Sequence, residues 1–334
     1  MLAQVEPALQ PFYGMMLYHL GLAASIQSPG GGKRMRPLLC VLVYEALAGD
    51  APSAGVLPAA AALELLHNFT LIHDDIEDQD PTRHHRPTVW SVWGVPQAIN
   101  TGDGMYAASR LAVQRLRDRG FPADRILDFA CLIDQACVRV CEGQFLDISF
   151  ESRTDVTVDR YRSMAAKKTG ALIAACAEGA AVLATDDPLV RESLARFGDA
   201  FGQAFQAYDD LLGIWATTER TGKIEMNDLM KRKKTLPVVM AFEKGSPRAK
   251  AELAALFGQP APLPAENVER IRELLDDLGP REQLEREITT HRTRALQELR
   301  GIAAVAASRE PLELLEQLVA TATGTEEPVG SGSR

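Results

Sequence analysis

Residues 59–78 read AAAALELLHNFTLIHDDIED, and their apolar side chains recur at intervals of three and four positions. This spacing places the apolar side chains on one face of an α-helix. The stretch is mostly apolar up to Ile72 and ends in four acids, Asp74, Asp75, Glu77 and Asp78. A helix of this composition belongs in a protein core, where solvation does not explain a cluster of carboxylates. The sequence therefore predicts a buried helix that carries acidic groups to a site.

The acids at the end of this helix are spaced to share a face. Asp74 and Asp78 are four residues apart, so both lie on one side of the helix, in line with Thr70 and His67. Like charges this close repel each other and need a counter-charge. Mg²⁺ fits, because it prefers oxygen ligands and is typically held by one or two carboxylates together with a substrate phosphate. A solvated acidic helix end is the alternative interpretation of the same pattern.

The same helical periodicity recurs along most of the chain, in residues 122–150, 157–184, 187–212, 264–278 and 280–307. Glycine and proline separate these stretches, while alternating β-branched runs are nearly absent. We predict an all-α fold, a single domain of ten or more helices packed as a bundle over residues 1–322. Residues 323–334, TGTEEPVGSGSR, are expected to form a disordered tail.

Composition excludes several classes of partner. The 36 Lys and Arg against 45 Asp and Glu leave a formal net charge of −9, which argues against a nucleic-acid-binding protein. The longest apolar run, residues 170–184, is interrupted by Glu178 and is shorter than the ~20 residues of a membrane-spanning helix. No signal peptide is recognisable, and five dispersed cysteines are typical of reduced core residues. We therefore expect a cytoplasmic protein without an integral membrane segment.

A second acidic pair, Asp209 and Asp210, follows Phe205-Gln206 and echoes the first helix. It lacks a carboxylate one turn further on, because residue 213 is glycine. A solvated helix end and a metal site explain the pair equally well. A dense cationic segment follows within 25 residues, and it includes Lys223 and Lys233. Carboxylates followed by cations fit a site for a metal-complexed phosphate.

Three further stretches gather cations. Gly30–Gly32 precede Lys33, Arg34 and Arg36, and a glycine loop followed by basic side chains can cradle an anion. Arg83 and Arg86 flank His84 and His85 just beyond the first acidic cluster, and Lys167-Lys168-Thr169 precedes the long apolar run. A flexible basic turn or a basic helix end explains each stretch alone. Zinc is disfavoured at the two histidines, because no cysteine or third histidine is close in sequence.

Taken in order, these motifs resemble those of the trans-isoprenyl diphosphate synthases, the polyprenyl synthetase family. The resemblance spans residues 31–237 and rests on GGKRMRP, ELLHNFTLIHDDIED, RHHRPTVW, INTGD, EGQFLD, KKTG, FQAYDDLLG, TGK and NDLMKRKKTLP. It implies an all-α bundle around a deep central cavity, a homodimer, and Mg²⁺-dependent head-to-tail condensation of isopentenyl diphosphate with an allylic diphosphate. Three Mg²⁺ ions are expected.

The resemblance also implies roles for single residues. Asp74, Asp78 and Asp209 would hold Mg²⁺, with Asp75 and Asp210 as further catalytic acids. The allylic diphosphate would contact Arg83, Lys168, Thr169, Gln206, Lys223 and Lys233. Isopentenyl diphosphate would bind Gly32, Lys33, Arg36, His67 and His84. An aromatic side chain at Phe69 beside the small Thr70 implies a floor for medium-length products, C20 first and C15 next, although ordinary core packing explains Phe69 equally well.

Two departures from the family pattern bear on activity. His84 stands where a second arginine is usual, and Gly213 stands where the second acidic motif usually ends in aspartate. These departures keep two alternatives open. One is a class I terpene cyclase, which usually carries a serine where Lys231 lies, and the other is a weakly active regulatory subunit of a heteromeric synthase.

Overall fold

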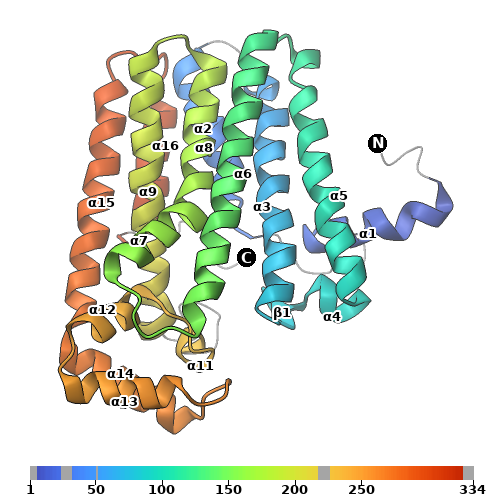
Figure 1. Ribbon diagram of the computed structural model, residues 1–334. Coiled ribbons are helices and arrows are strands. Elements are labelled where there is room, and N and C mark those ends of the chain that lie inside the picture. Colours follow the sequence, from blue (N-terminus) through green and yellow to red (C-terminus); the bar gives the residue numbers. More distant parts are fainter. Residues whose placement is uncertain (1–5, 24–31, 50–51, 217–225, 326–334) are drawn as a thin grey trace, which may run out of the picture. The chain divides into compact units, whose positions relative to one another are not determined.

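The computed structural model describes residues 6–23, 32–49, 52–216 and 226–325, and within them the chain is almost entirely helical (Figure 1). The predicted all-α fold is therefore confirmed. The chain divides into two compact units. Unit 1 comprises residues 1–133 and 179–186, and unit 2 comprises residues 134–178 and 187–334. A single domain over residues 1–322, with a deep central cavity, stays a prediction.

Unit 1 contains the helix that carries the first acidic cluster. Its helices are α1 (Gln10–His19), α2 (Met35–Ala48), α3 (Leu57–Glu77), α4 (Val89–Trp93), α5 (Val95–Gln114) and the first part of α6 (Ala123–Glu151). Among the described residues of unit 1, short 3₁₀ turns lie at Pro7–Leu9, Ser53–Gly55 and Arg117–Arg119, and the strands β1 (Thr82–Arg83) and β2 (Arg86–Pro87) form a small hairpin.

Helix α3 packs along α5, as Figure 1 shows, and small residues allow the two to lie close. The hydroxyl of Ser109 on α5 donates a buried 2.9 Å hydrogen bond to the carbonyl oxygen of Ala62 on α3. Leu63, Leu66 and Ile72 of α3 are almost fully buried. The apolar face predicted from residues 59–78 is therefore the face that α3 buries, and this anchors its acidic end.

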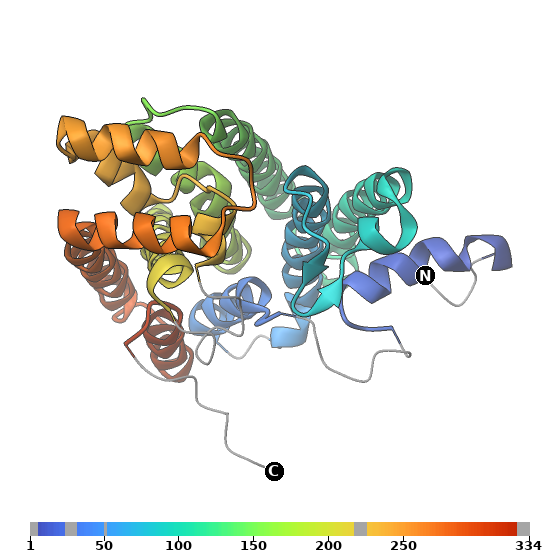
Figure 2. The same cartoon turned by 90° about the horizontal axis from the view of Figure 1, so that it is seen from below.

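Unit 2 holds the second acidic pair on a long helix. It contains the remainder of α6, α7 (Val158–Ala165), a π-helical turn (Ala166–Gly170), most of α8 (Ala171–Ala184), α9 (Pro188–Trp215), α11 (Asn227–Met230), α12 (Leu236–Lys244), α13 (Pro247–Phe257), α14 (Ala265–Leu278), α15 (Pro280–Ile302) and α16 (Glu310–Ala322). Helices α9 and α15 run side by side, while α13 and α14 run crosswise to them, which is clearest in Figure 2.

Helix boundaries in unit 2 follow capping chemistry. The Asp187 side chain accepts a 2.9 Å hydrogen bond from the backbone N–H of Leu189, and Pro188 occupies the first turn of α9. Gly279, with φ of 67°, ends α14 in the left-handed conformation and starts α15. The predicted helices at 187–212, 264–278 and 280–307 therefore match α9, α14 and α15 closely.

Two sequence expectations need correction or stay open. None of the five cysteines forms a disulfide, but Cys131 and Cys141 are exposed on α6, so the expectation of five core cysteines is wrong for these two. The tail was expected from residue 323, whereas Thr323 is 2% exposed and its hydroxyl donates to the carbonyl oxygen of Val319. The rest of that segment, 326–334, lies outside the described residues. Within the described residues, no helix has the length and apolar character needed to cross a membrane.

Candidate functional site

The acidic end of α3 is organised around Arg83. The guanidinium donates from Nε to Asp75 Oδ1 at 2.7 Å and from Nη2 to Asp74 Oδ2 at 3.3 Å. Arg83 reaches them from strand β1, which the hairpin places beside the end of α3. One planar cation therefore holds two adjacent carboxylates, a geometry that suits arginine better than lysine.

The two neighbouring aspartates have different environments. Asp75 is 1% exposed, whereas the side chain of Asp74 is 20% exposed. Burial raises the pKa of Asp75 to about 6, although the Arg83 charge and hydrogen bond work in the opposite direction. Asp75 therefore anchors the arginine, while Asp74 keeps access to a ligand. Asp78 is the C-cap residue of α3, and its backbone N–H donates to the carbonyl oxygen of Asp74.

The hairpin brings His84 to the glycine loop. His84 and His85 form its two-residue turn with φ of 49° and 60°, and positive φ at both central positions is what a type I′ turn requires. A Cβ atom placed on Gly32 would lie 3.8 Å from His84 Nε2. The structure thus brings together Gly32 and His84, which are 52 positions apart, as the resemblance implied for an isopentenyl diphosphate site.

Arg36 and His67 belong to the same group of residues. Arg36 Nη1 lies 3.0 Å from His67 Nε2, which places helix α2 against helix α3 at this level. Burial lowers the pKa of His67 well below its usual range, and the charges of Arg36 and Arg83 lower it further. Because the His67 imidazole is neutral, the positive charge available to a diphosphate is on the guanidinium groups of the arginines. Lys33 is exposed in the segment before α2.

Sequence reasoning missed His19 and the role of Arg86. Burial, together with the charges of Arg83, Arg86 and His84, lowers the pKa of His19 to about 3. Arg86 donates to the carbonyl oxygens of Tyr18 and His19 at 3.0 and 3.2 Å, so it ties the end of α1 to the hairpin. The Arg-His-His-Arg motif was visible in sequence, but nothing there connected it to α1.

Phe69 and Thr70, the expected chain-length pair, lie one turn further back on α3. The Phe69 ring makes edge contacts with Tyr106 of α5 and with His73, at centroid distances of 5.3 and 5.7 Å. The Thr70 hydroxyl donates to the carbonyl oxygen of His67 at 2.7 Å. Phe69 therefore belongs to a partly buried aromatic cluster, and its role in product length stays a prediction.

In unit 2, the second acidic pair likewise combines a more exposed aspartate with a buried one. Asp209 is exposed, whereas Asp210 is 3% exposed. Asp210 Oδ2 accepts hydrogen bonds from the Tyr161 hydroxyl at 2.6 Å and from the backbone N–H of Leu236 at 3.1 Å. Oδ1 accepts from Gln206 Nε2 at 3.0 Å. Burial raises the pKa of Asp210 to about 7, although these three hydrogen bonds lower it.

The π-helical turn positions Lys168 and Thr169, and glycines on two neighbouring helices make room for it. A Cβ atom on Gly143 would lie 2.3 Å from the Lys168 nitrogen, and one on Gly202 would lie 2.7 Å from the Gly170 Cα. Side chains at either position would therefore separate α6 or α9 from the turn. Single π-helical turns inside helices are frequent at functional sites.

Two hydrogen bonds of predicted site residues accompany that close packing. Lys168 Nζ donates to Asp147 Oδ2 at 2.6 Å, four residues after Gly143. The Thr169 hydroxyl donates to Gln206 Oε1 at 2.5 Å, four residues after Gly202. Thr169, Gln206 and Asp210 thus form one hydrogen-bonded chain. Asp147 lies in the EGQFLD motif, and sequence reasoning assigned it no role.

The cationic segment after α9 is partly described. Lys233 lies in the turn after α11, where its backbone N–H donates to the carbonyl oxygen of Asp228 at 2.8 Å. Lys223 lies outside the described residues.

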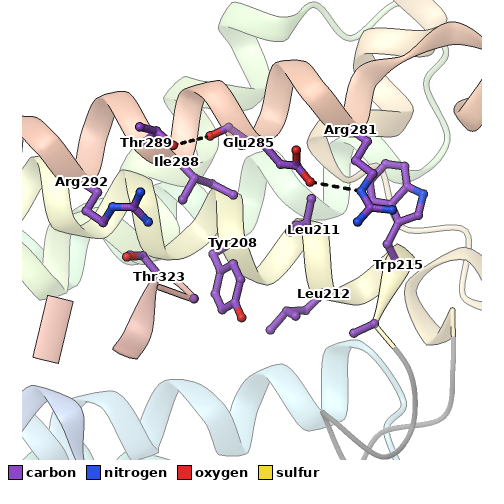
Figure 3. Close-up of a pocket in the computed structure, with 12 residues that line it drawn as sticks. Tyr208, Leu211, Leu212, Trp215, Arg281, Glu285, Ile288, Thr289, Arg292 and Thr323 are labelled. Carbon is purple, nitrogen blue, oxygen red and sulfur yellow. Dashed lines mark hydrogen bonds and ion pairs between the residues drawn. The ribbon is translucent and has the colours of Figure 1, made fainter. Parts of the chain in front are cut away.

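A pocket of about 260 Å³ in unit 2 is separate from these residues (Figure 3). It lies between α9, α15 and the end of α16, and its lining includes Tyr208, Trp215, Arg281 and Arg292. Tyr208 and Trp215 lie on the face of α9 opposite to Gln206 and Asp210, because residues seven apart share a face and successive residues turn by about 100°. Neither Gln206 nor Asp209 lines the pocket. The pocket therefore is not the site that the motifs predict.

The donor chemistry fits Mg²⁺. Asp74, Asp78 and Asp209 offer hard carboxylate oxygens, which Mg²⁺ prefers. Among the described residues, no group of three or more His, Cys, Asp or Glu side chains is placed to hold a metal ion alone. Mg²⁺ is usually bound by one or two carboxylates together with waters and substrate phosphates, so such a cage is not required.

Comparisons with known proteins agree with the motifs and the fold. The profile of the family described as polyprenyl synthetase matches residues 21–278. A geranylgeranyl diphosphate synthase of Mycobacterium tuberculosis is 42% identical over 276 residues, covering 82% of this chain and 77% of that protein. A (2E,6E)-farnesyl diphosphate synthase of Mycobacterium bovis is 39% identical over 298 residues, covering 88% and 80%.

The fold agrees with a solved structure as well. The crystal structure of a geranylgeranyl pyrophosphate synthase from Corynebacterium glutamicum, complexed with isoprenyl diphosphate and magnesium, matches with a TM-score of 0.80 and 28% identity. The match covers 95% of this chain and 96% of that one. Since the family profile covers more than half of the sequence and the relatives extend over most of their own length, this chain belongs to the polyprenyl synthetase family.

Proposed function

We propose that this protein condenses isopentenyl diphosphate head-to-tail with an allylic diphosphate, in the presence of Mg²⁺, to give a C20 or C15 trans-prenyl diphosphate. The observation that carries the proposal is the position of Arg83. Its guanidinium donates a hydrogen bond to Asp74, one of the carboxylates proposed to bind Mg²⁺. Its charge also lowers the pKa values of His67 and His19. One residue thus connects an acidic cluster with a cationic one, as a site for metal-complexed diphosphates requires.

The chain's own residues account for binding. Arg36 and Lys33 offer positive charge to isopentenyl diphosphate, and the neutral His67, which is bonded to Arg36, lies beside them with Gly32 and His84. Arg83, Lys168, Thr169, Gln206 and Lys233 are assigned to the allylic diphosphate, as is Lys223. Asp74, Asp78 and Asp209 would hold Mg²⁺, three ions in all. Asp75 and Asp210 are better suited to positioning, because both are buried and bonded to protein groups.

The reaction breaks the C–O bond of the allylic diphosphate and leaves an allylic cation. When bound, Mg²⁺ helps neutralise the charge that develops on the departing diphosphate. The arginine and lysine side chains stabilise the same charge through preorganised hydrogen bonds. The double bond of isopentenyl diphosphate attacks the cation, and a proton is then lost. The released diphosphate accepts this proton in the proposed scheme, so no protein base is assigned.

We also propose that the protein is a homodimer that uses α6 as an interface. Leu127, Val138, Phe145 and Ile148 are 63%, 60%, 70% and 45% exposed and follow one side of this helix, together with the exposed Cys131 and Cys141. An exposed apolar stripe of this kind, interrupted on the same face by Asp134, marks an interaction surface more often than a solvated one. A cytoplasmic location is proposed because none of the five cysteines forms a disulfide.

The deciding experiment is product sizing. Purified protein is incubated with Mg²⁺, labelled isopentenyl diphosphate and, separately, C5, C10 and C15 allylic diphosphates, and the products are dephosphorylated and separated by length. A dominant C20 or C15 alcohol is expected. The proposal would be overturned if none of the three primers were elongated. In that case a cyclised hydrocarbon would indicate a terpene cyclase, and no product at all would indicate a regulatory subunit.

A further inference from the structure

The second acidic motif ends in Gly213, and the structure shows what occupies the space beside it. A Cβ atom placed on Gly213 would lie 2.1 Å from Asp228 Oδ2 and 2.9 Å from Asp228 Cγ. Any side chain at residue 213 would therefore collide with the Asp228 carboxylate. Gly213 lies in the regular part of α9 and has no positive φ, so its backbone does not require glycine. The approach of Asp228 is the feature that requires it.

Packing explains why Asp228 reaches this point. The next residue, Leu229, is fully buried in a cluster that also contains Ile214, the residue after Gly213. The two buried neighbours bring the short helix α11 against α9, so that Asp228 abuts Gly213. The turn that follows is closed by the hydrogen bond from the Lys233 N–H to the Asp228 carbonyl oxygen. The carboxylate is thus carried by a defined backbone on a well-packed anchor.

The position of this carboxylate relative to the second acidic motif is informative. Gly213 is four residues after Asp209, so both lie on one face of α9, one turn apart. If residue 213 were an aspartate, its Cβ atom would occupy the space of the Asp228 carboxylate, and its own carboxylate would extend from there. Asp228 is also close enough to Tyr161, together with Asp210 and Asp147, to help burial raise the pKa of the Tyr161 hydroxyl. Asp147, Asp210 and Asp228 therefore all lie close enough to act on Tyr161, which contacts Asp210 on α9.

We propose that Asp228 supplies the third carboxylate of the second acidic motif, in place of the aspartate missing at residue 213, and acts on Mg²⁺ and its bound waters beside Asp209. The inference deepens the proposed function and rests on it. Its chemistry is that of any hard-cation site, where an acidic side chain from another segment serves as well as one from the same helix. Gly213 then makes room for the substitute carboxylate and is not a defect of the motif.

The test separates Mg²⁺ binding from elongation. Mg²⁺ is titrated by calorimetry into the full-length protein saturated with inorganic diphosphate, for the parent and for Asp228→Asn, Gly213→Asp with Asp228→Ala, and Asp277→Asn. Alanine is used in the double variant because only the Cβ of residue 228, 3.5 Å from a Cβ at residue 213, then remains beside the new aspartate. Asp277→Asn removes an exposed carboxylate on α14 as a matched control. Asp228→Asn should raise the half-saturating Mg²⁺ concentration by about tenfold or more, the usual effect of losing a residue that supports a metal site. The double variant should recover most of that loss, and Asp277→Asn should resemble the parent.

Several outcomes decide the proposal. Unchanged Mg²⁺ binding in Asp228→Asn would overturn it, and so would a double variant that binds no better than Asp228→Asn. If Asp228→Asn fails to fold, as judged by thermal unfolding without Mg²⁺, Gly213→Ala replaces it, because its Cβ displaces the carboxylate and keeps the charge. Weaker Mg²⁺ binding in that variant supports the proposal, and parent-like binding overturns it. If the parent elongates primers but these variants bind Mg²⁺ as the parent does, only this inference is wrong. If the parent elongates no primer, the proposed function itself is wrong.

Discussion

The Tyr161 hydroxyl donates a 2.6 Å hydrogen bond to Asp210, and both side chains are buried in unit 2. The same relation holds in unit 1, where Arg83 donates to the buried Asp75. In each acidic pair the second aspartate is held by protein groups, and the first is the more exposed. Each pair therefore combines an anchor with a ligand-facing carboxylate, which explains why two adjacent acids recur at both sites.

Tyr161→Phe should destabilise the protein by about 1–3 kcal/mol, because it leaves part of a buried carboxylate without its donor. Gln206 shares Asp210 with Tyr161, so the KM for the allylic diphosphate should rise more than kcat falls. Urea unfolding and steady-state kinetics measure the two effects. Tyr13→Phe is the control, since no hydrogen bond of the Tyr13 hydroxyl is seen among the described residues. Equal effects of both variants would contradict the anchoring role of Tyr161.

Arg83→Lys should cost about 1.5–3 kcal/mol of stability, because an ammonium group cannot span Asp74 and Asp75 as the guanidinium does. We expect the KM for the allylic diphosphate to increase about tenfold at constant Mg²⁺. Arg119→Lys replaces an exposed arginine in unit 1 and should change neither quantity. If Arg83→Lys has the same kinetic constants as the parent, Arg83 does not take part in binding the diphosphate.

Lys234 should make stability depend on pH in the alkaline range. Burial lowers its pKa from 10.5 to about 8, aided by the charge of Arg232, while the rings of Phe242 and Phe257 lie 4.8 and 4.2 Å from its ammonium nitrogen. Between these pKa values the unfolded chain binds more protons than the folded one, so this residue makes stability rise from pH 8 to pH 10.5.

The measurement is the difference in unfolding free energy between the parent and Lys234→Met. Between pH 8 and pH 10.5, the unfolding free energy of the parent should rise by about 2 kcal/mol relative to that of Lys234→Met. Lys244→Met, at an exposed lysine at the end of α12, should give a flat difference. A flat profile for Lys234→Met as well would mean that Lys234 keeps its ordinary pKa.

Phe69→Ala should lengthen the products by one or more C5 units, because it removes an aromatic ring from the α3 face that precedes the acidic cluster. Phe12→Ala is the matched control, since Phe12 is partly buried against the same apolar cluster. Each variant should lose about 2 kcal/mol of stability, somewhat less than a fully buried Phe→Ala change. Chromatography of the dephosphorylated products gives the answer. An unchanged product length in Phe69→Ala would leave Phe69 with a packing role only.

Phe145→Asp should dissociate the proposed homodimer, because it places a charge in the apolar stripe of α6. Size-exclusion chromatography with light scattering should change from twice the 36.4 kDa chain mass to the chain mass itself. Leu189→Asp is a control of matched exposure, 71% against 70%, at the start of α9. A parent protein that is monomeric, or a dimer that survives Phe145→Asp, would contradict the interface.

Much of the fold was predictable from local sequence patterns. The boundaries of α9, α14 and α15 follow from Pro188, Gly279 and the three- and four-residue spacing of apolar side chains, because capping and amphipathicity act over single helical turns. The two acidic pairs and the cationic motifs were identified in the same way. The pairing of Gly32 with His84, or of Thr169 with Gln206, connects segments dozens of residues apart, and no local pattern encodes it.

The sequence by itself determined the helical class, the family and the types of residue available for binding diphosphates and Mg²⁺. Tertiary structure alone decided which of those residues are accessible. Asp209 and Asp210 are adjacent in sequence, yet one is exposed and the other is buried against Tyr161 and Leu236. The absence of a carboxylate at Gly213 was readable at once, but the carboxylate of Asp228 beside it was not. The reason is physical: burial and close approach depend on how helices pack, and packing joins residues that the linear order keeps apart.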